Sequence, residues 1–144
     1  MQDVIVTVLG IQRDADGQET RIETVANGKI HQKGDMHYLT YREREEDGSD
    51  TATLIKVNET AMTLVRRGQI EHEQRFQTDR RENGTYKTRY GTIHMAVETH
   101  SLELSMVDLS GSIVLDYDLH VEGQWQSHNL LSIKISRDHT LNVH

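Results

Sequence analysis

The sequence contains no cysteine and no proline, and its aromatic content is low, with one tryptophan and one phenylalanine. The absence of cysteine excludes disulfides, thiolate nucleophiles and cysteine-ligated zinc. No apolar run approaches the roughly 20 residues of a membrane-spanning helix. The N-terminal segment also lacks the basic region of a signal peptide. We therefore expect a soluble, cytoplasmic protein that does not associate with membranes.

The acidic balance of the chain argues against a nucleic-acid partner. Lysine and arginine number 16 against 23 aspartate and glutamate residues, a formal net charge of −7. Such a surface repels phosphate backbones. We expect no nucleic acid to bind.

Without proline, a two-residue alternation of apolar and polar residues runs through most of the chain. It is clearest from 113 to 121, where apolar side chains occupy every second position. This period is typical of strands with one dry and one wet face. No segment shows a capped helical period of 3.6 residues. The sequence therefore predicts an all-β fold.

Short polar turns separate the predicted strands, so neighbouring strands should pair as antiparallel hairpins. We expect strands at 3–12, 18–32, 36–44, 51–58, 61–67, 69–78, 85–90, 92–99, 101–109, 112–121 and 125–136. Gly28, in the middle of the second strand, predicts a β-bulge. The few long connections favour a single antiparallel up-and-down β-barrel of about eight to eleven strands. One domain should span residues 1–144.

Several motifs resemble a known bacterial family. They are Leu64-Val65-Arg66-Arg67-Gly68, Gln74-Arg75-Phe76, Tyr86, Tyr90-Gly91, the run 113–121 and His128-Asn129. From about residue 6 to 135 the chain resembles the YwiB-like domain of unknown function, whereas 137–144 departs from its pattern. The resemblance implies a calycin-like, lipocalin-like barrel in a small cytosolic protein. It brings no established activity and no catalytic residues.

Polar residues in phase with apolar neighbours should point into the barrel, where an unpaired polar group costs roughly 1–3 kcal/mol. The candidate ligand-binding residues chosen on this basis are Arg66, His72, Gln74, Tyr41, Tyr117 and Asn129, with Asn129 expected on the same face as Trp125. Arg66 would pair with a carboxylate or phosphate of a ligand. The sequence thus favours a non-catalytic module that holds a small amphipathic or anionic ligand inside the barrel. A hydrogen-bond network satisfied within the protein is the structural alternative.

Two other functions stay open. Apolar residues on the predicted wet face indicate a protein–protein contact or a homodimer, and these residues are Val107, Leu109, Val114 and Leu130. A metal-assisted enzyme is the third hypothesis, with Asp116, Asp118 and His120 on one strand face and His94 or His128 beside them. We interpret that face as solvated and expect no metal and no cofactor. No catalytic set is apparent, so the sequence leans against an enzyme without deciding the matter.

Overall fold

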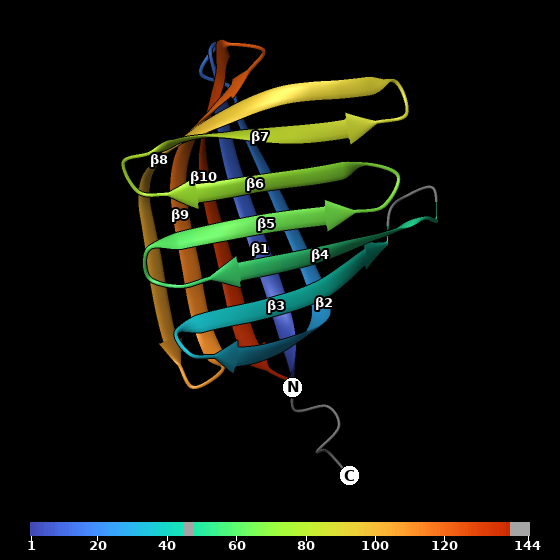
Figure 1. The fold of residues 1–144 in the computed structure, drawn as a ribbon, viewed down its shortest axis with the longest axis vertical. Coiled ribbons are helices and arrows are strands. Elements are labelled where there is room, and N and C mark those ends of the chain that lie inside the picture. Colours follow the sequence, from blue (N-terminus) through green and yellow to red (C-terminus); the bar gives the residue numbers. More distant parts are fainter. Residues whose placement is uncertain (45–47, 139–144) are drawn as a thin grey trace.

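The computed structural model describes residues 1–44 and 48–138, which form ten β-strands. The strands are β1 (Gln2–Asp14), β2 (Glu19–Lys33), β3 (Met36–Arg44), β4 (Asp50–Val57), β5 (Ala61–Arg67), β6 (Glu71–Gln77), β7 (Arg81–Thr88), β8 (Gly91–Val107), β9 (Ser110–Val121) and β10 (Gln124–Arg137). Each strand pairs antiparallel with its sequence neighbours, and β1 pairs with β10 to close the barrel (Figure 1). The predicted all-β, up-and-down barrel is confirmed.

The barrel has two layers whose strands run crosswise. In Figure 1, β3 to β7 cross in front of β1, β9 and β10. Crossed layers of one continuous sheet require strands that pass from one layer to the other. The long strands β2 and β8 do so: β2 pairs with β1 and then β3, and β8 pairs with β7 and then β9.

Gly28 occupies the part of β2 that pairs with both β1 and β3. The bulge predicted there is wrong, because the pairing with β1 continues through Gly28 without a register shift. Glycine is required for a different reason: a Cβ atom at this position would lie 2.7 Å from the carbonyl oxygen of Thr40. The residue permits close approach of neighbouring strands where β2 changes layers.

Two strand boundaries also differ from the prediction. The segments 92–99 and 101–109 belong to one strand, β8, because a register shift between Thr99 and Ser101 absorbs the irregularity at His100. Strand β7 begins at Arg81 rather than at 85. A bulge interrupts the alternation of side chains without ending the strand, so the pattern alone suggested a break.

Alternate residues of both layers fill the space between them. The largest fully buried apolar side chains are Val4, Val6, Ile30, Leu39, Ile55, Val57, Met62, Val97, Ile113, Leu115 and Ile133. Phe76 of β6 meets Tyr117 of β9 edge to face, with 4.9 Å between ring centroids. This contact joins the front layer to the back layer.

Among the described residues, no helix is long and apolar enough to cross a membrane.

Candidate ligand-binding site

A row of polar side chains crosses the inner face of the front layer. Strand register places Tyr41 opposite Thr53, Thr53 opposite Arg66, Arg66 opposite His72, and His72 opposite Tyr86. Antiparallel partners point to the same side of a sheet, and Tyr41 and Thr53 are buried. We name these five residues the inner polar row.

The inner polar row lies close to the ends of its strands, where the barrel meets solvent. Arg66 is the penultimate residue of β5, and His72 is the second residue of β6. Arg66, His72 and Tyr86 are each half-buried, whereas Tyr41 and Thr53 are buried. The row therefore leads from solvent toward the core.

Arg66 is the only permanently charged residue of the inner polar row. It makes no ion pair with any residue in the described part of the chain. Its register partners on the adjacent strands, Thr53 and His72, supply no carboxylate. Burial, assisted by the charge of Glu43 and opposed by the charge of Arg66, raises the pKa of Tyr41 to about 12.

His72 is held in its neutral form. Burial, and after it the charge of Arg66, lowers the pKa of His72 below its ordinary value of 6.5. Its Nε2 atom is buried and has no hydrogen-bond partner among the described residues. The ring also packs against Tyr86, with centroids 5.5 Å apart. A buried ring nitrogen without a partner is an unsatisfied group that a ligand or water would satisfy.

A small hollow of about 50 Å³ lies beside Arg66 at the ends of β5, β6 and β7, and most of its lining residues belong to the outer-face rows that contain Val65 and Arg67. It is lined by Arg66, Arg67, His72 and Lys87, with Glu71 and Glu73 among its other walls. Since one water occupies roughly 30 Å³, the hollow has room for a carboxylate-sized group and not for a complete lipid. Its three full cations outnumber its two carboxylates.

Gln74, another of the six candidates, has a structural role. Its side chain is buried, and Nε2 donates hydrogen bonds to the backbone oxygens of Arg75 at 3.0 Å and Glu82 at 3.1 Å. The β6–β7 register pairs end beside it, at Glu73 and Thr85. A Cβ atom at Gly84 would collide with the Gln74 amide. The glutamine thus bridges two strands where their backbone pairing lapses.

Tyr117 and Asn129 lie on the back layer, apart from the inner polar row. They face each other across β9 and β10, and Tyr117 contacts Phe76 of the front layer. Asn129 Nδ2 donates to Ser127 Oγ at 2.9 Å, and burial raises the pKa of Tyr117 to about 12. The structure therefore brings together only Tyr41, Arg66 and His72 of the six candidates.

The expectation that Trp125 shares a face with Asn129 is wrong. A register shift between Trp125 and Ser127 changes the phase of β10, so Trp125 lies opposite the outward-facing His120. Thr53 and Tyr86 belong to the inner polar row although they were not among the candidates. Thr53 could have been found, because it is in phase with Ile55 and Val57 on β4.

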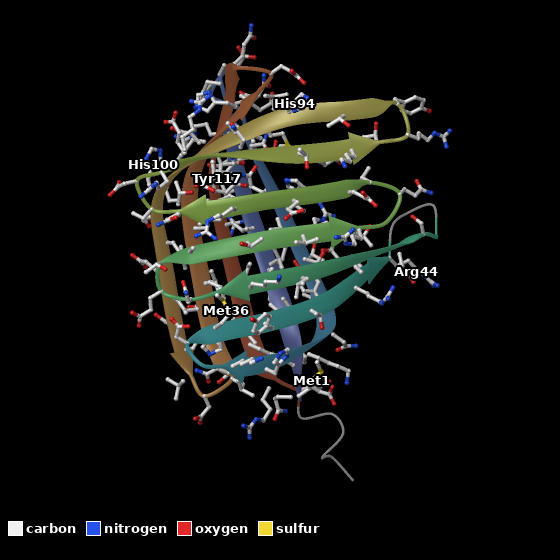
Figure 2. All side chains as sticks on the ribbon, in the orientation of Figure 1. Met1, Met36, Arg44, His94, His100 and Tyr117 are labelled. Carbon is white, nitrogen blue, oxygen red and sulfur yellow. The ribbon has the colours of Figure 1, made fainter. Side chains whose placement is uncertain are left out.

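Histidines paired with carboxylates occupy the outer face of β8, β9 and β10. The pairs are His128 with Asp116 at 2.6 Å, His100 with Asp118 at 3.0 Å and His120 with Glu98 at 3.6 Å. Figure 2 shows His100 on the outside of the barrel. Within residues 1–44 and 48–138, no group of three or more metal-ligating side chains is arranged to hold an ion. The metal hypothesis at Asp116, Asp118 and His120 thus has no coordination geometry to support it.

Comparison with known proteins points to one family. Its sequence profile, described as a domain of unknown function, DUF1934, matches residues 6–133. The "Uncharacterized beta-barrel protein YwiB" of Bacillus subtilis (strain 168) is 32% identical over 113 residues, which cover 78% of each protein. The crystal structure of the ywiB protein from Bacillus subtilis superposes with a TM-score of 0.85 at 26% identity, covering 95% of this chain and 92% of the other. The chain therefore belongs to the DUF1934 family of uncharacterised β-barrel proteins.

Proposed function

We propose that this barrel is a cytoplasmic, non-catalytic binding module that binds the anionic head group of a small molecule at Arg66. The observation that carries the proposal is the inward-facing Arg66, which has no ion-pair partner among residues 1–44 and 48–138. A half-buried cation without a counter-charge is costly to desolvate. An incoming carboxylate or phosphate would supply that charge and accept a bidentate pair of hydrogen bonds.

The residues around Arg66 support an anion rather than a cation or a purely apolar ligand. Tyr41 keeps its hydroxyl proton at pH 7, because its pKa is raised to about 12. His72 offers a ring nitrogen with no partner in the described structure. Each of these neutral groups can donate a hydrogen bond to an acceptor oxygen, depending on the tautomer of the histidine.

The packing of the barrel interior limits the ligand class. The central core between the layers is occupied by apolar side chains, including Leu39, Ile55 and Leu115. We therefore favour a small anion over the long apolar ligands associated with lipocalin-like barrels.

Native mass spectrometry of protein purified gently from cells tests this function. We expect a bound small anion on the wild type that is absent from Arg66→Leu, whereas Arg80→Leu should retain it as a matched control on an exposed loop. Thermal unfolding must show that each variant is folded. A bare wild-type mass, or an adduct that survives in Arg66→Leu, contradicts the proposal.

A second proposal is self-association through the outer face of β1, β2 and β10. Val25 is 63% exposed and Leu130 is 37% exposed, and each lies opposite a residue of β1, namely Thr7 and Ile11. Exposed apolar residues on adjacent strands favour an interface. Of the residues predicted for this role, Leu109 packs against the core instead. A monomer in light scattering for both wild type and Val25→Asp/Leu130→Asp would count against self-association.

A further inference from the structure

A groove of about 740 Å³ lies on the outer side of β2 to β5, the side of the front layer that faces away from the core. In Figure 1, β3, β4 and β5 cross the front of the barrel. The volume of the groove is in the range of about 300–1,000 Å³ that small-molecule sites occupy. Ala52, Leu54 and Val65 contribute an apolar floor.

Two arginines flank this floor. Register places Arg42 opposite Ala52 and Ala52 opposite Arg67, so all three share one row on the outer face. With neighbouring strands about 4.8 Å apart, the two arginines are separated by about 10 Å at the backbone. Neither arginine forms an ion pair with a residue in the described part of the chain.

Besides the two arginines, the groove is lined by Lys29 and by two carboxylates, Asp3 and Asp138. Lys29 Nζ lies 2.8 Å from Asp3 Oδ1, which neutralises the wall on that side. Glu71 lies opposite Arg67 on β6 and offsets part of its charge. Arg42 is therefore the cation on the groove with the least compensation by a described neighbour.

A second outer hollow, over β5 to β8, provides a useful contrast. It is of similar volume, about 720 Å³, but it is lined mainly by polar groups such as Asn83, Thr85 and His94. Its arginine, Arg75, is paired with Glu82 at 3.7 Å. Unlike that hollow, the groove over β2 to β5 joins an apolar floor to an arginine without an ion-pair partner among the described residues.

We propose that this groove is a second binding site, for a small molecule with an apolar body and an anionic head group. The apolar body lies across Ala52, Leu54 and Val65, and the head group contacts Arg42. The site is separate from Arg66, because Arg42 and Arg66 point to opposite faces of the sheet. Arg67 lines both this groove and the small hollow beside Arg66, and is therefore left unchanged in the test.

Two fluorescent probes separate the parts of this claim. 1-Anilinonaphthalene-8-sulfonate carries an apolar body and a sulfonate, whereas N-phenyl-1-naphthylamine has a similar body without the charge. We expect the wild type to bind the sulfonate probe more tightly. Reversal of one charge, in Arg42→Glu, should weaken sulfonate binding by about tenfold, because one charge-assisted contact is lost and repulsion replaces it. The neutral probe should bind that variant as it binds the wild type.

Control variants make the result specific. Arg21→Glu reverses an exposed charge elsewhere on β2 and should leave affinity within about twofold, and so should Arg66→Leu, whose effect belongs to the other site. Leu54→Ser should weaken both probes. Amide chemical shifts should change at residues 40–42, 52–54 and 65. Equal affinity of the wild type for both probes, unchanged sulfonate binding by Arg42→Glu, or shift changes confined to another face would overturn the proposal.

Discussion

Arg66 and His72 lie directly opposite each other on β5 and β6, and both turn toward the barrel interior. Burial, followed by the charge of this arginine, lowers the pKa of His72. The pairing places a fixed cation beside a neutral imidazole and supplies no carboxylate. It is the relationship from which the anion-binding proposal and the first prediction both follow.

Replacement of His72 should reduce the loss of stability in mild acid. Its pKa in the folded protein lies below 6.5, so the unfolded chain binds more protons at this position once the pH falls through about 6.5. The free energy of unfolding therefore decreases as the pH falls from about 6.5 to the pKa of His72 in the folded protein. Urea unfolding of His72→Gln should show a shallower decline than the wild type between about pH 7 and 5. Parallel declines would contradict the assignment.

His100 should show the opposite linkage. The hydrogen bond to Asp118 raises the pKa of His100. Desolvation lowers that pKa in part, whereas the charges of Asp118, Asp116 and Glu98 raise it further. The stabilisation that His100 contributes is complete below pH 6.5 and is lost as the pH rises through the pKa of His100 in the folded protein. In NMR titrations of the imidazoles, His100 should titrate above 6.5 and His72 below it. Asp118→Asn should lower the pKa of His100 and leave the pKa of His72 unchanged.

Loss of the Gln74 amide should destabilise the fold. Gln74→Met keeps the approximate side-chain volume but leaves the carbonyls of Arg75 and Glu82 without their amide donor. An unsatisfied buried polar group costs roughly 1–3 kcal/mol, so we expect a loss of that order in the free energy of unfolding. Gln69→Met, on the exposed β5–β6 connection, should change stability by less than about 0.5 kcal/mol. Equal effects of the two substitutions would argue against the bridging role.

The alternation of the sequence predicted the fold and the direction of most side chains. It placed Tyr41, Arg66 and His72 on the inner face, because burial of one strand face requires every second residue to point inward. It could not show that these three share one row, since that depends on register between strands. Nor could it place Trp125, because a bulge reverses the phase of β10 between Trp125 and Ser127.

The outer groove could not be predicted from the sequence for a related reason. Arg42, Leu54 and Val65 each read as ordinary wet-face positions on separate strands. Their juxtaposition arises only when the strands pair and the sheet turns at β2, with Gly28 at the point of closest approach. Pattern identifies the face of a strand, whereas a site requires the relative placement of several strands.

The titration of His72 in the presence of an anion tests the central claim most directly. A phosphate bound at Arg66 would offset the arginine charge that helps to lower the pKa of this imidazole. At matched ionic strength, we predict a higher His72 pKa in phosphate than in chloride for the wild type, and no difference between the two salts for Arg66→Leu. The same His72 pKa in both salts for the wild type, or an equal rise in the variant, would contradict anion binding at Arg66.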